Sequence, residues 1–221
     1  LIENGLPVLT GNEIEKWKKL IDGALATFDL GNAIRPTGRI AIRTGGILPY
    51  FGTGWLIADD LIATSGYFGK SLAETGKDGR YQFKMYGDTV ASATIDFLVE
   101  YNNEAKAIFD IGECVYLSES EDPDVAIFKV KLPEAGSGYH PLMLSDPAAD
   151  IRENVAVIGY PGHNRLDAHQ DDIKRIYNNI FEVKRLAVGQ VTDLGSDRFL
   201  YDATVQRGCF GAPVYSLQTG K

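Results

Sequence analysis

After Gly31 the sequence is a succession of short runs rich in β-branched and aromatic residues, each bounded by Gly, Pro, Asp or Asn. Many short runs at regular spacing are typical of β-sandwiches and β-barrels, whereas parallel α/β folds alternate strands with longer helical stretches. The runs cover 39–44, 52–59, 61–65, 81–87, 93–101, 106–117, 124–130, 154–162, 179–195, 199–205 and 212–217. The sequence therefore predicts an all-β protein.

The loop "PEAGSGYHP" at 133–141 separates two groups of predicted strands. Because this stretch is rich in Gly and Pro, we interpret it as the seam between two halves of one domain. The predicted organisation is an N-terminal segment over 1–37, a first β-structure over 38–132 and a second over 133–221. The polar segment 163–178 is predicted to be a surface loop or a short helix.

An amphipathic helix is predicted over about 12–28, before the first strand. Apolar residues recur there at spacings of three and four, at Ile14, Trp17, Leu20, Ile21, Leu25 and Phe28. Thr10 and Glu13 could form a capping box, and Asn12 is a rival N-cap. The apolar face either packs on the chain's own domain, which we favour, or docks a partner.

Composition limits the classes of function. The formal net charge is −8 and the isoelectric point is near 4.9, which argues against nucleic acid or an anionic membrane as the main partner. No stretch is long and apolar enough to span a membrane. We expect neither a cofactor nor a bound metal.

The two cysteines, Cys114 and Cys209, allow one bridge but no disulfide framework. This pattern favours a reducing compartment or a bacterial origin, so we expect a cytoplasmic protein. Since the sequence starts at Leu1 without a visible signal peptide, we expect a processed product or a fragment of a longer chain.

Four segments, in this order, resemble trypsin-like serine peptidases of the bacterial type. They are "GTGWLIADDLIATSGYF" (52–68), "DPDVAIFKV" (122–130), "VAVIGYPG" (155–162) and "VGQVTDLGSDRFLYDATVQRGCFGAPVY" (188–215). Each is a weak motif alone, but their order and spacing together are specific. The resemblance covers roughly 38–221 and implies two six-stranded Greek-key β-barrels with a site in the cleft between them. It also implies at least one further strand, so we expect sequence beyond Lys221.

The family's catalytic triad maps onto three positions, of which one keeps its residue type. Asp124 matches the aspartate, Tyr67 falls at the histidine position and Phe210 falls at the serine position. A tyrosine with its ordinary pKa near 10 is protonated at neutral pH and is a poor base. A phenylalanine has neither a lone pair nor an ionisable proton. The resemblance therefore implies a peptidase frame whose catalytic chemistry has been removed.

Other features of the family's site are matched to different degrees. Gly208 and the backbone N–H of Phe210 match the oxyanion-hole donors, which could still bind a carbonyl or carboxylate oxygen. Asp202 is a loose match to a specificity-pocket residue, or simply a turn or surface acid. Cys209 is the alternative nucleophile, but it lies one residue before the serine position and lacks a histidine partner.

The three histidines do not restore the triad. His140 lies in the seam, and His163 and His169 lie in the polar segment; each is more simply a surface residue.

We interpret the chain as an inactive homologue, a pseudoprotease, that binds a peptide or protein segment in the cleft as part of a larger protein. The alternative is an active endopeptidase that uses Cys209 or a triad we have misaligned. An unrelated β-sandwich is a further alternative.

Overall fold

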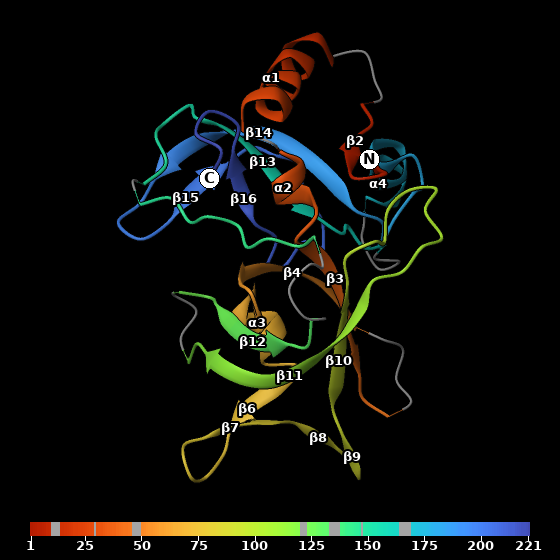
Figure 1. The fold of residues 1–221 in the computed structure, drawn as a ribbon, viewed down its shortest axis with the longest axis vertical. Coiled ribbons are helices and arrows are strands. Elements are labelled where there is room, and N and C mark those ends of the chain that lie inside the picture. Colours follow the sequence, from red (N-terminus) through yellow and green to blue (C-terminus); the bar gives the residue numbers. More distant parts are fainter. Residues whose placement is uncertain are drawn as a thin grey trace.

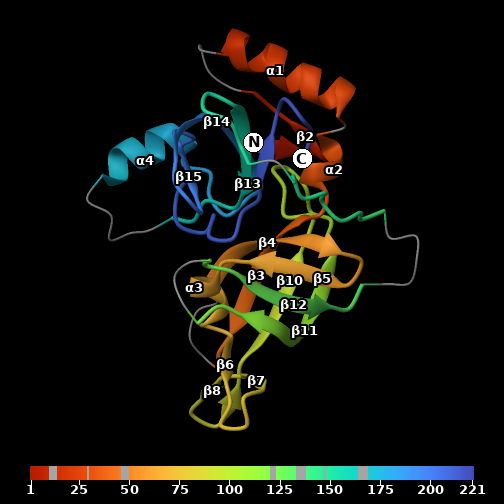
Figure 2. The ribbon, with the colours of Figure 1, turned by 90° about the vertical axis from the view of Figure 1, so that its left-hand side faces the viewer.

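The computed structural model describes residues 1–9, 14–28, 30–45, 50–119, 123–132, 138–146, 148–163 and 169–221. Two β-structures are stacked along the long axis of the molecule, and α1 lies at the far end of the second one (Figures 1 and 2). The all-β prediction is confirmed, and the helices are few and short.

The first half is a closed six-stranded barrel with the order β10-β11-β12-β5-β4-β3. Residues pointing into this barrel alternate along its strands, as in β3, where Ile40 and Ile42 are buried. The core is completed by Leu56, Ile95 and Phe128, all at most 1% exposed. The strands are β3 (Thr37–Arg43), β4 (Tyr50–Ala58), β5 (Leu61–Thr64), β10 (Ser92–Asp96), β11 (Ile108–Leu117) and β12 (Ala126–Val130).

Two predicted strands of this half are shorter than expected because groups within them form hydrogen bonds outside the strand ladder. The run 81–87 is split at Lys84, whose N–H donates to Leu72 O. The run 93–101 ends at Asp96, whose carboxylate accepts the N–H groups of Leu98 and Ala107. The pieces form two small hairpins, β6 (Ala73–Thr75) with β7 (Tyr81–Phe83), and β8 (Met85–Tyr86) with β9 (Thr89–Val90).

Within the described residues, the second half is a four-stranded antiparallel sheet, where six strands were expected. Its order is β15-β14-β13-β16, comprising β13 (Asn154–Gly159), β14 (Arg185–Leu194), β15 (Phe199–Tyr201) and β16 (Val214–Ser216). The predicted strand 179–195 begins only at Arg185, because Asn179 and Glu182 have φ of 54° and 60°, outside the β region.

Helix α1 (Ile14–Thr27) packs on the sheet of the second half, so the preferred interpretation of its apolar face is confirmed. Ile21 and Ala24 are buried in one cluster with Ile158 and Tyr215. The same cluster includes residues of α2 (Gly31–Ile34) and of β1 (Ile2–Glu3), which pairs with β2 (Leu6–Pro7). The capping residues expected at 10–13 lie outside the described residues.

The two halves are joined by buried polar contacts. Tyr160, from the second half, is 1% exposed and its hydroxyl donates to Thr37 O at 3.3 Å. Lys184 is fully buried, and its ammonium donates to Ile34 O, Phe97 O and Glu100 Oε1 at 3.0, 2.8 and 3.3 Å. Because these groups come from both sides of the junction, they fix the two halves relative to each other.

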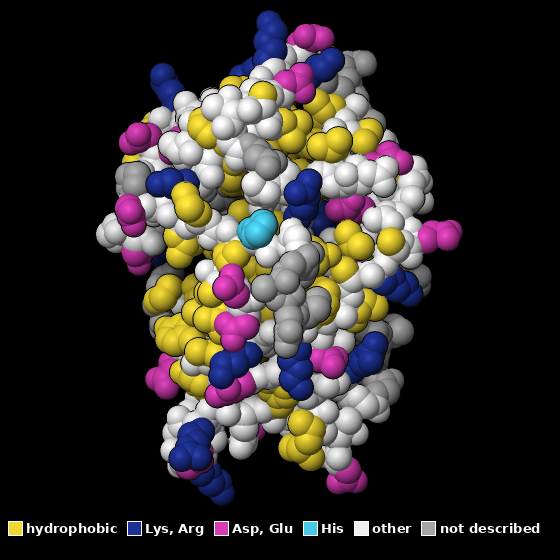
Figure 3. Space-filling view, in the orientation of Figure 1, with side chains coloured by type: hydrophobic (Ala, Val, Ile, Leu, Met, Phe, Trp, Pro, Cys, Tyr) yellow, Lys and Arg dark blue, Asp and Glu magenta, His cyan; other side chains and the backbone are white. Residues whose placement is uncertain are grey.

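The domain boundaries predicted at 37/38 and 132/133 stay a prediction. None of the described helices is long and apolar enough to cross a membrane. On the face shown in Figure 3, Lys and Arg side chains are interspersed with Asp and Glu side chains.

Candidate functional site

The structure places Asp124 directly beside Tyr67. Thr64 in β5 pairs with Ala126 in β12, so the residues just beyond these strand ends are neighbours. There the short helix α3 (Gly66–Gly69) begins after Ser65, whose side chain accepts the N–H of Phe68. The preceding N–H in this turn, that of Tyr67, donates to Asp124 Oδ1 at 2.6 Å.

The hydrogen bond between Tyr67 and Asp124 is made by the backbone and not by the phenol. Tyr67 is 60% exposed, and its hydroxyl has no hydrogen-bond partner within the described part of the chain. The second carboxylate oxygen of Asp124 likewise accepts no hydrogen bond from these residues. The carboxylate is thus held in place with one oxygen left to accept from a further donor.

Phe210 lies in a loop, residues 206–213, that is made of two consecutive turns. Cys209 N–H donates to Gln206 O, and Ala212 N–H donates to Cys209 O. The third residue of each turn is a glycine, Gly208 with φ of 94° and Gly211 with φ of 79°. A positive φ at this position is the mark of a type II turn, which explains the Gly-x-x-Gly spacing.

Buried Thr53 on β4 fixes this loop to the first barrel. Its N–H donates to Phe210 O at 3.0 Å, and its hydroxyl donates to Gly208 O at 2.7 Å. The same hydroxyl accepts the N–H of Tyr160 at 3.2 Å. One threonine therefore connects the loop to both halves of the molecule.

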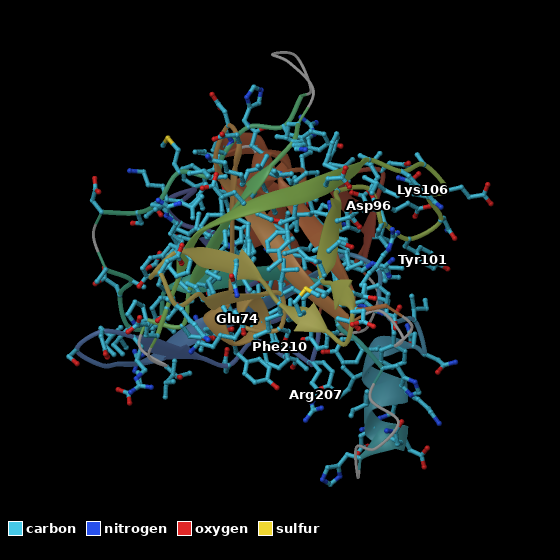
Figure 4. All side chains as sticks on the ribbon, turned by 90° about the horizontal axis from the view of Figure 1, so that it is seen from below. Glu74, Asp96, Tyr101, Lys106, Arg207 and Phe210 are labelled. Atoms are coloured by element: carbon cyan, nitrogen blue, oxygen red, sulfur yellow. The ribbon has the colours of Figure 1, made fainter. Side chains whose placement is uncertain are left out.

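The rings of Tyr67 and Phe210 are in contact, with centroids 5.5 Å apart and planes inclined by 52°. Phe210 is 37% exposed, so both rings reach the surface. Figure 4 shows Phe210 and Arg207 at the same rim of the molecule. The three positions matched to the triad are therefore neighbours in space, with an aromatic pair where a base and a nucleophile would be needed.

The backbone N–H groups of Gly208 and Phe210 make no hydrogen bond within the described residues. Their predicted role as donors to a ligand oxygen stays a prediction.

The surroundings of Cys209 disfavour an activated thiolate. Burial raises the pKa of its thiol to about 11, although Arg185 and a hydrogen bond with the backbone of Gln206 act in the opposite direction. The thiol is therefore protonated at neutral pH, whereas nucleophilic cysteines are thiolates. Both cysteines are free, with Cys114 in the core of the first barrel.

The remaining acidic and histidine candidates have structural roles or are exposed. Asp202 Oδ1 accepts the N–H of Gln190 at 2.7 Å and so connects its segment to β14. His163 is partly buried, stacks on Phe181 at 4.8 Å and hydrogen-bonds Gln170. His140 and His169 are exposed, as expected. No group of three potential metal ligands is found among the described residues.

Two cavities lie in the second half, and neither is lined by Asp124, Tyr67 or Phe210. A groove of about 670 Å³ runs along β16 and the residues around Phe199. A smaller cavity of about 150 Å³ lies behind Cys209, between β13, β14 and α4 (Gln170–Tyr177). The smaller cavity could not be predicted from the sequence, because its polar residues Tyr177 and Arg185 belong to no motif.

Replacing Gly211 with alanine is expected to destabilise the fold by about 3 kcal/mol or more. An added Cβ would lie 2.6 Å from Ser65 N and Thr53 O and would collide with the hydroxyl of Thr64. Gly79→Ala is the matched control, since its φ is 77° but no atom lies within 4 Å of the added Cβ. That variant should lose only about 1 kcal/mol. Urea unfolding measures the free energy of unfolding of both variants. Equal losses of stability would mean that the loop is not packed on the first barrel.

Comparison with known proteins agrees with this geometry. The family model described as trypsin-like peptidase domain matches residues 52–221. No curated protein sequence matches the chain.

Among solved structures, Deg5 is similar with a TM-score of 0.59 and 15% identity, over 94% of this chain and 84% of that one. The thermostable serine protease AL20 from an extremophilic microorganism has a TM-score of 0.55 and 15% identity, over 84% and 80%. The Rv3671c protease from M. tuberculosis in its active form has a TM-score of 0.53 and 18% identity, over 100% and 78%.

Proposed function

The chain belongs to the trypsin-like peptidase family, and we propose that it uses this fold to bind a peptide or protein segment rather than to hydrolyse it. The observation that carries the proposal is the contact between Tyr67 and Phe210 next to Asp124. Peptide hydrolysis by this fold needs a base that takes a proton and a nucleophile that attacks the carbonyl. Phenylalanine supplies no nucleophile, and a phenol lacks the basic ring nitrogen with which a histidine takes the proton.

The alternative nucleophile is disfavoured by its environment. The Cys209 thiol is largely buried and its pKa is raised to about 11. A general base beside it would be needed to remove its proton. Arg185 is the titratable group that lowers the pKa of this thiol, and the titration of Tyr177 and Tyr201 is coupled to that of Cys209. Burial raises the pKa of both tyrosines above the ordinary value of 10, so their hydroxyls keep their protons at neutral pH and do not accept one from the thiol.

The aromatic pair supports a binding role. Tyr67 and Phe210 present two adjacent rings to solvent, and aromatic residues are enriched where proteins bind their partners. The N–H groups of Gly208 and Phe210 are available as donors to the backbone carbonyls of an extended segment. We therefore propose a partner segment in extended conformation that places an apolar side chain against the two rings.

The test is hydrolysis of casein by the purified chain, together with labelling by a serine-directed phosphonate. We expect neither turnover nor labelling. Turnover that co-purifies with the protein through several columns would contradict the proposal. In that case Cys209→Ala shows whether the thiol is responsible.

Binding is tested separately with a library of fluorescent extended peptides. Peptides that bind the natural chain should bind a Tyr67→Ala, Phe210→Ala variant at least about tenfold more weakly, because the rings are the proposed contact surface. Met143→Ala is a control variant, since Met143 is 68% exposed and lines the larger groove, away from the ring pair. Equal loss of affinity in both variants would argue against the surface formed by Tyr67 and Phe210 as the binding site.

A further inference from the structure

The cavity of about 150 Å³ behind Cys209 combines apolar walls with a cationic side chain. Val157, Ile176, Leu186 and Ala187 supply apolar surface, and Tyr177 and Arg185 are the large polar residues of the lining. Ile176 is 54% exposed and Thr204 is also exposed, so the cavity reaches the surface. A small molecule from solution can therefore enter.

Arg185 has a positive charge that no acidic side chain neutralises within the described part of the chain. Its Nη2 donates to Tyr177 O at 2.6 Å and to Ile180 O at 3.0 Å, at the carboxyl end of α4. Its Nε–H is buried and has no hydrogen-bond partner among these residues. A half-buried cation with an unused donor is costly unless an anion accompanies it.

The hydroxyl of Tyr177 is a second unused polar group in the same cavity. Tyr177 is 6% exposed, its hydroxyl is buried, and the described residues offer it no hydrogen-bond partner. The guanidinium of Arg185 lies over its ring at 5.1 Å. A buried polar group without a partner is destabilising, so two in one small cavity indicate a missing ligand.

We propose that this cavity binds a small oxyanion, such as a carboxylate or an inorganic phosphate. Arg185 Nε–H and the Tyr177 hydroxyl are both donors, and the guanidinium adds the positive charge that an oxyanion requires. The volume suits a group the size of acetate or phosphate. Cys209, which lies between Gly208 and Phe210 in the sequence, lines the cavity. The bound anion therefore lies on the inner side of the loop 206–213. The cavity takes an oxyanion whether or not the chain hydrolyses peptides.

The experiment is an NMR titration of the uniformly ¹⁵N-labelled chain that follows the arginine Nε–H resonances. The probes are sodium acetate, sodium phosphate and acetamide at constant ionic strength and pH 7. Arg185 is assigned as the resonance lost in Arg185→Gln. We expect acetate or phosphate to shift it with saturation and acetamide to leave it unchanged. Whichever of acetate and phosphate saturates the shift at the lower concentration shows whether the site prefers a carboxylate or a phosphate.

The matched variant is Tyr177→Phe, because it removes only an oxygen that has no described partner. Without an anion, its thermal unfolding midpoint should equal or exceed that of the natural chain. Its apparent affinity for the oxyanion should fall about tenfold. The proposal is overturned if neither anion shifts the Arg185 resonance, if acetamide shifts it equally, or if Tyr177→Phe binds as tightly as the natural chain.

Discussion

A chain carrying both Tyr67→His and Phe210→Ser is expected to hydrolyse casein at least about 100-fold faster than the natural chain. A positioned base contributes roughly 10²–10⁴ to such a rate, and it acts only where a nucleophile is present. The Tyr67 N–H occupies Oδ1 of Asp124, and Oδ2 is left to accept from an imidazole at position 67. The loop 206–213 already holds position 210 beside position 67.

The single variants are the controls for this gain. Tyr67→His lacks a nucleophile and Phe210→Ser lacks a base, so each should remain as inert as the natural chain. Adding Asp124→Asn to the double variant should reduce its rate by about 100-fold or more, because the imidazole loses its orienting acceptor. A double variant that keeps the natural unfolding midpoint and stays inert would contradict the inferred alignment of the three positions.

Replacing Glu100 with alanine is expected to destabilise the fold by about 3–5 kcal/mol at pH 7. Glu100 and Lys184 form an ion pair whose side chains are 3% and 0% exposed, so the substitution leaves a buried ammonium without its counter-charge. It also removes the acceptor for the N–H of Gly5, which connects the N-terminal hairpin to the junction. Urea unfolding measures the loss.

Two control variants separate the buried charge from simple truncation. Glu113 pairs with Lys129 at the surface, where the side chains are 65% and 49% exposed, and Glu113→Ala should lose at most about 1 kcal/mol. A Glu100→Leu, Lys184→Met double variant removes both charges and should regain part of the stability lost in Glu100→Ala. Equal losses in Glu100→Ala and Glu113→Ala would contradict a buried pair.

The loss of stability caused by Glu100→Ala should also become smaller at alkaline pH. Burial lowers the pKa of Lys184 to about 8 from its ordinary value of 10.5, against the opposing effect of Glu100. Between these values the folded chain binds fewer protons than the unfolded chain, so the contribution of Lys184 to stability rises with pH. Above pH 9 the folded lysine is mostly neutral and no longer needs the carboxylate. A penalty independent of pH between 7 and 9.5 would mean that the ammonium is not the cause.

The sequence predicted the fold class because strand-length apolar runs and turn residues are local signals. The run that contains Ile40 and Ile42 on β3 and the apolar face of the helix at Ile21 and Leu25 were predictable from the sequence pattern alone. The runs 81–87, 93–101 and 179–195 were read too long. The N–H of Lys84 and the carboxylate of Asp96 bond to groups outside the strand ladder, and Asn179 and Glu182 have positive φ. The spacing of apolar residues reveals neither kind of feature.

The match of positions 67, 124 and 210 to the catalytic triad was also inferred from the sequence. The resemblance matches these positions to the histidine, aspartate and serine of the triad, and the sequence has tyrosine, aspartate and phenylalanine there. Their proximity depends on β5 pairing with β12 and on Thr53 holding the loop 206–213. Both are contacts between residues far apart in the chain.

The protein's sequence by itself determined an all-β chain with a peptidase-like order of motifs, and it places Tyr67, Asp124 and Phe210 at the positions matched to the triad. Only the tertiary structure decided that Tyr67 and Phe210 form a contact pair, that partial burial raises the pKa of the Cys209 thiol, and that Lys184 pairs with Glu100. It also brought Arg185 and Tyr177 together in one cavity. The reason is physical: burial and charge pairing depend on distances in three dimensions. For residues far apart in the chain, the local sequence does not determine those distances.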